Sequence, residues 1–401
     1  GGGGTYVAFL VAGLVALVTA YSYARLSVAV ASDEGTVSYL DEAFGEGTLT
    51  GSLNVLLWIA YVITTSLYAY AFGSYGATFA SAGSQAAWSH VLITAAIVVF
   101  TALNVLSAKL IAAAEDYIVA AKIAILVAFV AYAMTRTDLS ASTPSHWERP
   151  GSLVAGGMLV FVAYEGFELI ANAAEDIRDP KRTIPRALYT SVLFTIVLYM
   201  LVAVVTVGLL SATEIVRAAD FALAEAAQRV WGSVGFDLIV VAALLSTASA
   251  INATLYGTAR LSVDIALDGE LPSALEDQIA GKPLVGLFLT AGFALLVANL
   301  VPLEAISSMA SAAFLIVFAA VNAANVRLAD RTSSRRWLSV LGAVMCVGAL
   351  VALLAHIAGN RPQDLVLMAV IAALTVVGER TYQLRRRRRP LSDRRSRRGA
   401  R

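Results

Sequence analysis

The feature that most constrains this chain is a series of eleven apolar stretches, each long enough to cross a lipid bilayer. A bilayer core about 30 Å thick requires about 20 helical residues. Because lipid offers the backbone no hydrogen-bond partners, such segments must be helices. We therefore predict an all-α, polytopic membrane protein with one transmembrane domain over residues 1–384. The predicted spans are residues 5–30, 52–80, 88–106, 112–134, 152–173, 187–210, 234–259, 284–301, 304–326, 338–357 and 364–384.

The composition agrees with a chain embedded in a membrane. Apolar residues make up 59% of the 401 residues, and the mean hydropathy is +0.75. Soluble domains are about 45–50% apolar. A soluble fold would therefore leave too much apolar surface in contact with water.

Basic residues are distributed unevenly between the two sides that alternating spans define. All but six of the 29 Lys and Arg residues fall within the connections that share a side with the C-terminus. By the positive-inside rule, that side is cytoplasmic. We expect a multi-pass protein of the cell membrane whose C-terminus is cytoplasmic and whose first visible helix runs inward. A chain that starts outside with four glycines and no methionine suggests that a first helix is missing.

An arginine-rich tail, residues 385–401, follows the last span. Five adjacent arginines, Arg385 to Arg389, form a basic segment next to the membrane. Such segments are attracted to anionic lipids of the cytoplasmic leaflet. Nucleic-acid binding is less favoured, because the tail has no aromatic side chains on which bases would stack. The sequence thus predicts a tail that associates with anionic lipids and not with nucleic acid.

Residues 161–187 carry the strongest functional signal. Glu165 and Glu168 flank Gly166 inside an apolar span. Hydrocarbon does not solvate ionised groups, so carboxylates inside a span indicate a functional site. A glycine there allows the helix to break and to present backbone groups to a ligand. Asp179-Pro180 and Ile184-Pro185 are expected to stop the helix, since the residue before a proline is pushed out of the α region. The alternative is an ordinary kinked helix whose carboxylates face a water-filled crevice.

Two further polar features lie inside apolar spans. Lys122 is roughly 13 Å from the cytoplasmic start of its span, at about 1.5 Å per residue. A low dielectric favours a neutral lysine, so a proton could bind and leave there; the alternative is a permanently charged brace between helices. The span 234–259 contains small hydroxylated residues, which are favoured where membrane helices pack closely and are also suitable ligands for a small cation. These polar residues are Ser246, Thr247, Ser249, Asn252 and Thr254.

The remaining reactive residues give no sign of enzyme chemistry. His90, His146 and His356 lack the spacing of metal ligands, and Cys346 is the only cysteine of the chain. The sequence contains no HExxH, GxSxG or phosphate-loop motif. We expect no enzyme activity, no metal and no cofactor.

One segment on the outer side, residues 211–232, has apolar residues at intervals of three and four. This spacing predicts a helix with one apolar face. Two roles are open to it. It either closes the outer entrance of the protein as a gate or rests passively on the membrane surface.

Two long motifs resemble the amino acid–polyamine–organocation transporters. Residues 161–188, FVAYEGFELIANAAEDIRDPKRTIPRAL, are similar to that family's helix 6 and the following loop. Residues 246–272, STASAINATLYGTARLSVDIALDGELP, are similar to its helix 8 and cytoplasmic exit. Residues 1–45 resemble helix 2, and residues 104–109 fit the end of helix 4. The chain departs from the family at Arg25, where glutamate is frequent.

The resemblance implies a leucine-transporter-like fold of two inverted five-helix repeats followed by two extra helices. The eleven visible spans would be helices 2 to 12, with helix 1 missing. In such a fold, discontinuous helices meet at a substrate site near the middle of the membrane. The segment implied to bind the ammonium group of the substrate consists of Phe161, Val162, Ala163, Tyr164, Glu165 and Gly166.

The resemblance also implies a secondary active transporter that moves amino acids by alternating access, coupled to protons. Lys122 stands where some proton-coupled members have a lysine in place of a sodium ion, and Ser246 and Thr247 would line the neighbouring cation region. Glu165 falls at a variable position, where its side chain either favours a cationic substrate or faces water. The alternatives are a sodium-coupled carrier, an exchanger, or a membrane sensor that binds a ligand without moving it.

Overall fold

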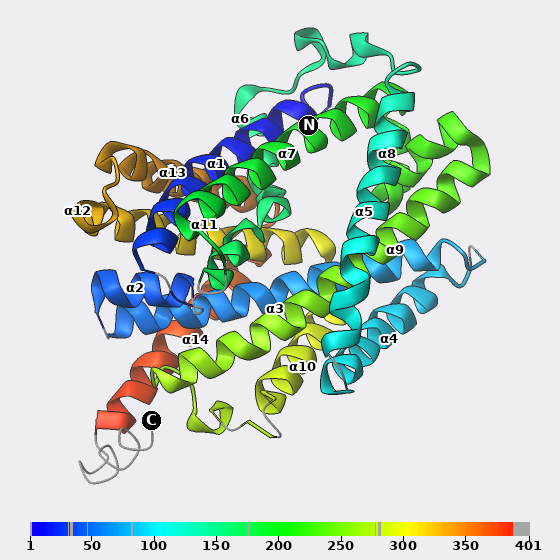
Figure 1. Cartoon of the computed structure of the whole chain (residues 1–401). Coiled ribbons are helices and arrows are strands. Elements are labelled where there is room, and N and C mark those ends of the chain that lie inside the picture. Colours follow the sequence, from blue (N-terminus) through cyan, green and yellow to red (C-terminus); the bar gives the residue numbers. More distant parts are fainter. Residues whose placement is uncertain are drawn as a thin grey trace.

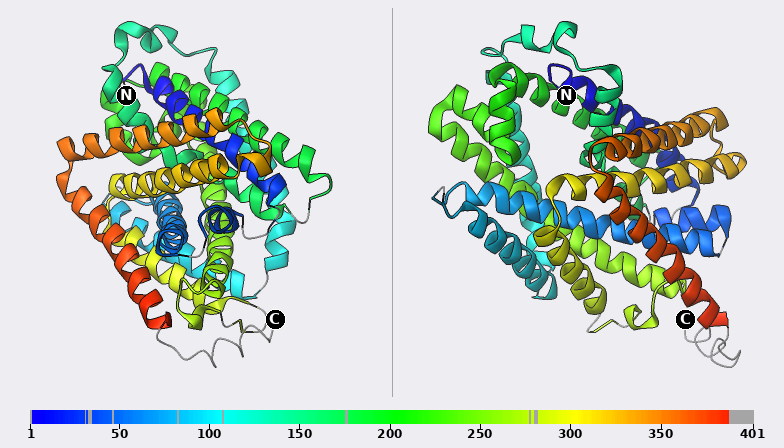
Figure 2. Two further views of the ribbon diagram at one scale, coloured as in Figure 1. Left: turned by 90° about the vertical axis from the view of Figure 1, so that its left-hand side faces the viewer. Right: turned by 180° about the vertical axis from the view of Figure 1, so that it is seen from behind.

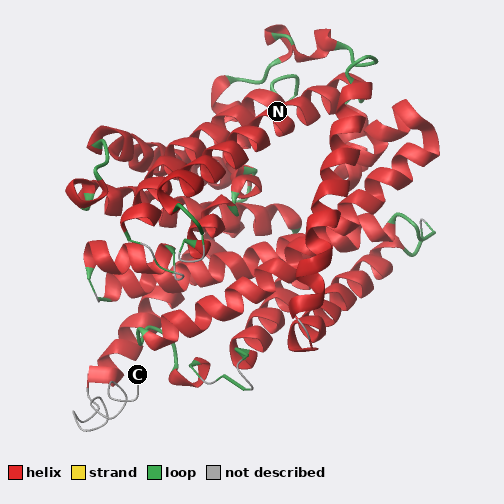
Figure 3. Ribbon diagram, in the orientation of Figure 1, coloured by secondary structure: helices red, strands yellow, loops and turns green. Residues whose placement is uncertain are grey.

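The computed structural model describes residues 2–30, 32, 35–45, 47–81, 83–106, 108–174, 177–276, 278, 279 and 282–387. These residues are predominantly helical (Figure 3). Within them, β-type pairing is limited to two isolated bridges, between Gly2 and Trp147 and between Ile279 and Lys282. The predicted all-α class is confirmed.

Every one of the eleven predicted spans corresponds to a helix or to a broken helix. Among the described residues, nine helices are long and apolar enough to cross a membrane. The start of α1 and the end of α14 lie at opposite ends of the molecule (Figures 1 and 2). The long helices are α1 (Thr5–Ala29), α3 (Thr48–Ala77), α4 (Gln85–Leu106), α5 (Ala108–Ala133), α7 (Pro180–Leu209), α9 (Ala222–Leu267), α11 (Leu303–Arg327), α13 (Arg336–Asn360) and α14 (Pro362–Arg387). Helix α9 consists of two helices that meet at a kink at Gly232, where φ is 67° and ψ is −155°.

The other two spans differ from a straight, long helix. The shorter apolar helix α10 (Leu284–Leu300) has 17 residues. The helix α6 (Pro150–Leu159) continues into two 3₁₀ segments, η3 (Phe161–Tyr164) and η4 (Phe167–Ala173). The axis bends by 57° between α6 and these segments. The predicted break in this span is therefore confirmed.

The long helices pack in two groups. In the first, α1 lies along α7 and also contacts α6. In the second, α3 crosses the centre of the molecule and contacts α4, α9 and α10 (Figure 1). Helix α11 contacts both α1 and α3, so it joins the two groups, and it also packs against α13. Helix α5 packs mainly on α9.

Two predicted helix boundaries are wrong. Helix α7 begins at Pro180 and not near residue 187. Proline is tolerated at the first helical position because the N–H that it lacks would have no hydrogen-bond partner within the helix. Pro185 then lies inside the helix. The predicted helix over residues 211–232 is interrupted by the 3₁₀ turn η5 (Ala219–Phe221), which separates α8 (Ala212–Ala218) from α9.

Short helices in the connections had no predicted counterpart. They include α2 (Thr36–Phe44), which packs on α11 and α3, and α12 (Ala329–Thr332). The remaining ones are single 3₁₀ turns: η1 (Leu139–Ser142), η2 (Pro144–His146) and η6 (Ser273–Leu275). Such elements are too short to show a hydrophobic period in the sequence.

An aromatic cluster holds the broken helix against α1 and α11. Phe161 and Phe167 both lie against Phe318 of α11, with ring centroids 6.0 and 5.5 Å apart. Phe167 also meets Tyr23 of α1 edge-on, at 5.7 Å. All four side chains are buried. Aromatic pairs of this kind contribute about 0.5–1.5 kcal/mol each beyond their buried area.

A buried polar network joins α1, α11 and α13 nearby. Ser22 donates a hydrogen bond to Oδ1 of Asn322 at 2.7 Å, and Nδ2 of Asn322 donates to the hydroxyl of Thr19 at 3.0 Å. The sulfur of Cys346 lies 3.5 Å from the same hydroxyl. Hydrogen bonds between side chains of membrane helices are worth about 0.6 kcal/mol on average. The network therefore fixes the relative positions of these three helices at a modest energy per bond.

Candidate functional site

The site is built around the interruption of the helix that begins with α6. The residue after α6, Val160, has φ −97° and ψ 9°, and Gly166 has φ 108°. This positive φ is accessible to glycine and strained for a residue with a side chain. A Cβ added to Gly166 would meet no atom within 4 Å, so the glycine serves the backbone conformation and not close packing.

Glu168 closes the turn at the break. Its Oε1 accepts a hydrogen bond from the hydroxyl of Tyr61 on α3 at 2.9 Å, and its Oε2 accepts one from the backbone N–H of Gly166 at 2.9 Å. The side chain is only 1% exposed. Both carboxylate oxygens are thus occupied, and Glu168 ties the broken segment to α3.

Glu165 has a different environment. Its Oε2 accepts a hydrogen bond from the hydroxyl of Tyr68 on α3 at 3.1 Å. The residue is half-buried, and its Oε1 accepts no hydrogen bond from the described residues. Of the two carboxylates in the predicted site, Glu165 is the one with an oxygen available to a ligand.

Polar side chains from two other helices hold the backbone of the broken segment, and a side chain of the segment bonds the backbone of a third helix. The N–H of Val162 donates to Oγ of Ser311 on α11 at 3.0 Å, and the carbonyl of Ala163 accepts from the hydroxyl of Tyr199 on α7 at 3.1 Å. The hydroxyl of Tyr164 donates to the carbonyl of Phe9 on α1 at 2.8 Å. The bonds from Ser311 and Tyr199 give partners to backbone groups that the break leaves without helical ones, as burial of polar backbone groups requires.

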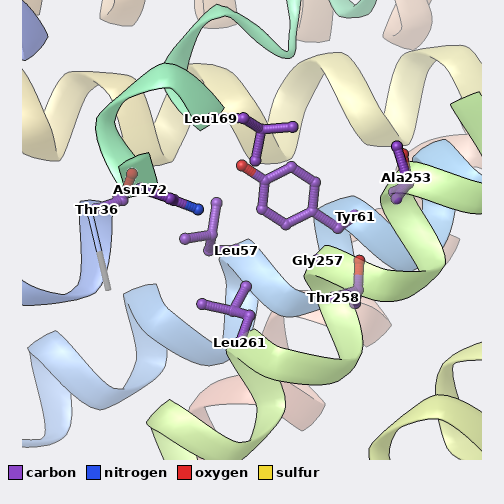
Figure 4. A pocket seen from close by; sticks show the side chains of 10 residues that line it. Thr36, Leu57, Tyr61, Leu169, Asn172, Ala253, Gly257, Thr258 and Leu261 are labelled. Carbon is purple, nitrogen blue, oxygen red and sulfur yellow. The ribbon is translucent and has the colours of Figure 1, made fainter. Parts of the chain in front are cut away.

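A small cavity of about 20 Å³ lies beside η4, which contributes Leu169 and Asn172 to its wall (Figure 4). Tyr61, which bonds Glu168, is part of its wall, so the cavity is connected to Glu168 through this side chain. The hydroxyl of Thr258, on α9, is buried and has no hydrogen-bond partner among the described residues. The lining residues are Thr36, Leu57, Tyr61, Leu169, Asn172, Ala253, Thr254, Gly257, Thr258 and Leu261.

Lys122 lies midway along α5 and is half-buried. Helices α5 and α9 are antiparallel: Ser249 donates to Glu115 at 3.3 Å near one end, and Phe129 meets Trp231 at 5.7 Å near the other. Lys122 therefore lies between these two contacts. The carboxylate of Glu115, two turns earlier on α5, interacts electrostatically with the amino group of Lys122.

The structure places the predicted cation region on the helix that faces Lys122. Ser246 and Thr247 are half-buried on α9, about one turn beyond the level of Ser249. The hydroxyl of Thr247 donates to the carbonyl of Ala243 at 2.8 Å, within its own helix. Among the described residues, no hydrogen bond joins Lys122 to either hydroxyl. The two helices bring these groups to neighbouring levels without direct contact.

Sequence reasoning missed the residues that organise the carboxylates. Tyr61 and Tyr68 donate to Glu168 and Glu165, and Ser311 and Tyr199 hold the backbone. One signal for the tyrosines was present. They are seven residues apart in an apolar span, which places both hydroxyls on one face of a helix.

Comparison with known proteins identifies the family to which this chain belongs. The amino acid permease profile matches residues 1–378. An uncharacterized protein of Methanocaldococcus jannaschii is 33% identical, covering 86% of this chain and 80% of its own length. The inner membrane transport protein YbaT of Escherichia coli is 31% identical, covering 87% of this chain and 80% of its own length. The serine/threonine exchanger SteT of Bacillus subtilis is 25% identical over 67% of this chain and 61% of its own length. The chain therefore belongs to the amino acid permease family, and its many apolar helices make it a multi-pass membrane protein of that family.

Proposed function

We propose that this chain is a secondary active transporter that moves amino acids across the cell membrane, together with protons, by alternating access. The observation that carries the proposal is the break at Phe161–Gly166, which is held by α1, α3, α7 and α11. Broken helices of this kind bind substrates in secondary transporters because they expose backbone dipoles near the membrane centre. Family membership supports the same class of substrate.

The backbone of residues 161–166 is proposed to bind the ammonium group of the substrate. Backbone carbonyl oxygens are good partners for an ammonium group because each oxygen carries a partial negative charge and accepts hydrogen bonds. Unlike a carboxylate, a carbonyl does not bring a full charge that would have to lose its hydration. Ser311 and Tyr199 act as positioning residues, since each bonds the backbone of this segment from a different helix. An amino acid bound here would contact both groups of helices at once.

Lys122 is proposed to be the group that couples transport to protons. A lysine at mid-membrane is costly while charged, so it gains or loses a proton more readily than one at the surface. Ser246 and Thr247, on the facing helix, are proposed to line the same region and to stabilise the charged form. Protonation of Lys122 would then alter the contact between α5 and α9, which is one of the contacts that alternating access must change.

Purified protein in sodium-free liposomes tests this proposal. Addition of substrate should drive proton uptake into the vesicles, measured with an internal pH dye. Sodium-dependent uptake would instead identify a sodium-coupled carrier. Substrate counterflow without proton movement would identify an exchanger, the activity named for the Bacillus subtilis relative. Ligand binding without any flux would identify a sensor.

The C-terminal segment 385–401 is proposed to associate with anionic lipids on the cytoplasmic side. Helix α14 continues to Arg387, beyond the predicted end of the span, and residues 388–401 lie outside the described residues. Each basic residue near an anionic surface contributes about 1 kcal/mol at most. Truncation after Leu384 should reduce sedimentation with phosphatidylserine-containing vesicles but leave uptake intact. Loss of uptake by correctly inserted protein would contradict a purely lipid-binding tail.

A further inference from the structure

The two carboxylates at the break differ in the number of hydrogen bonds they accept. Glu168 accepts two, one on each oxygen, and is almost completely buried. Glu165 accepts one, and its second oxygen has no partner among the described residues. An ionised carboxylate in a dry site needs more than one donor to be stable. Glu165 is thus built to receive a further donor, and Glu168 is not.

The charge of the site points to the kind of donor. Glu165 and Glu168 lie within electrostatic range of each other. Within the described part of the chain, neither carboxylate forms an ion pair with Lys, Arg or His. Lys122, midway along α5, is influenced by Glu115 instead. A ligand that carries positive charge would therefore meet two carboxylates and no competing cation.

The surroundings of Glu165 also suit a cation on an apolar stem. Tyr199 lies within electrostatic range of Glu165, and its ring meets Phe9 at 5.6 Å and Tyr164 at 5.4 Å between centroids. Aromatic faces attract ammonium and guanidinium groups, by about 0.5–2 kcal/mol depending on desolvation. They also pack against the methylene groups of a long side chain.

We propose that Glu165 makes this protein prefer amino acids with a cationic side chain, by pairing its free oxygen with the side-chain ammonium or guanidinium of the substrate. This inference rests on the proposed transport function. The α-ammonium of a neutral amino acid is balanced by its own carboxylate, so a neutral substrate brings no net charge to the two glutamates. Lysine, ornithine or arginine brings one positive charge and a stem long enough to reach from the backbone site.

Uptake by the purified protein in liposomes tests the inference. We expect the ratio of kcat/KM for L-lysine to that for L-alanine to exceed one in the wild type. In Glu165→Gln, which keeps the size and removes the charge, the ratio should fall by about tenfold or more. Glu165→Asp should recover part of the preference because it restores the charge. Asp237→Asn removes an exposed carboxylate on α9 and should leave the ratio at the wild-type value.

Two results would overturn the inference. The first is an unchanged ratio in Glu165→Gln that is inserted and folded. The second, which needs no variant, is wild-type alanine uptake that excess lysine, ornithine and arginine fail to inhibit. In that case amino acid transport stands and only the cationic preference is lost. If folded wild-type protein takes up neither neutral nor cationic amino acids, the proposed function itself fails.

Discussion

Two single residues stand out from the apolar helices of this protein. Lys122 is a basic side chain midway along an apolar helix, and Gly166 has a backbone conformation that side chains disfavour. Both were recognisable in the sequence, because charge and glycine are rare inside apolar spans. The partners of Glu165 and Glu168 were not recognisable as partners, since Tyr61 and Tyr68 lie about 100 residues away along the chain. Only the fold brings them together.

Replacement of Lys122 by alanine should uncouple transport from protons. Without the ammonium group, no proton is gained or lost at this level of α5, so a pH gradient should no longer drive accumulation, while substrate counterflow persists. The control is Lys181→Ala, an exposed lysine in the first turn of α7. Uptake in liposomes with an imposed pH gradient measures the effect. Normal gradient-driven accumulation by folded Lys122→Ala would refute this role.

Replacement of Gly166 by alanine should destabilise the protein by about 1–2 kcal/mol, the cost of a left-handed conformation for a residue with a Cβ. No neighbouring atom would clash, so the effect isolates the backbone strain. Gly156→Ala is the matched control: it lies within α6, and its added Cβ also meets nothing within 4 Å. There, alanine should be neutral or stabilising. Thermal unfolding in detergent distinguishes the two variants, and equal melting temperatures would show that the left-handed turn is not required.

At the level of elements, the apolar lengths in the sequence were sufficient to predict every span. They were insufficient for the connections. Helix α7 starts earlier than predicted because Pro180 suits a first turn, and the outer hairpin contains the turn η5 because its tertiary contacts override a helical period. One such contact is the hydrogen bond from Ser74 on α3 to Asp220 at 2.9 Å. Helix length is local information, whereas helix interruption depends on what packs against it.

The junction after α9 should make stability depend on pH. Glu270 accepts a hydrogen bond from Asn54 at 2.8 Å and lies close to Glu379 of α14, with both carboxylates beside Gly51. Burial, followed by the nearby acids Asp41, Glu379 and Asp268, raises the pKa of Glu270 to about 8, against the opposing effect of the Asn54 bond. The folded state therefore binds a proton that the unfolded chain releases near pH 4.5. Stability should be highest below that pH and should fall as the pH rises to about 8.

Glu270→Gln tests this dependence, because glutamine keeps an oxygen for Asn54 and has no proton to lose. Each unit of pKa shift corresponds to about 1.4 kcal/mol, so the wild-type melting temperature should fall measurably between pH 5 and pH 8. The decline in the variant should be smaller, and the variant should be the more stable of the two at pH 8. Parallel curves for wild type and variant would show that Glu270 does not titrate in this range.

For the whole molecule, α3 links several segments that are far apart in the sequence. From one end to the other it donates hydrogen bonds to four carboxylates on other segments: Asn54 to Glu270, Tyr61 to Glu168, Tyr68 to Glu165 and Ser74 to Asp220. The first three donors are seven residues apart and so share one face of the helix. A change of conformation that moves the broken helix or the outer hairpin relative to α3 must break one of these bonds.

The outermost of these bonds gives a test of gating by the hairpin α8–η5–α9. If the hairpin closes the outer entrance, loss of the Ser74 hydroxyl should favour the open state. One hydrogen bond contributes about 0.5–1.5 kcal/mol, so Ser74→Ala should speed the labelling of a cysteine placed at Leu223 by about two- to tenfold.

The single native cysteine, Cys346, is fully buried and gives little background. Ser84→Ala is the control, since among the described residues the hydroxyl of Ser84 bonds only Ser81, in the loop after α3. Bound substrate should slow labelling of Leu223→Cys. Labelling that responds neither to substrate nor to Ser74→Ala would mean that the hairpin rests on the outer surface without gating it.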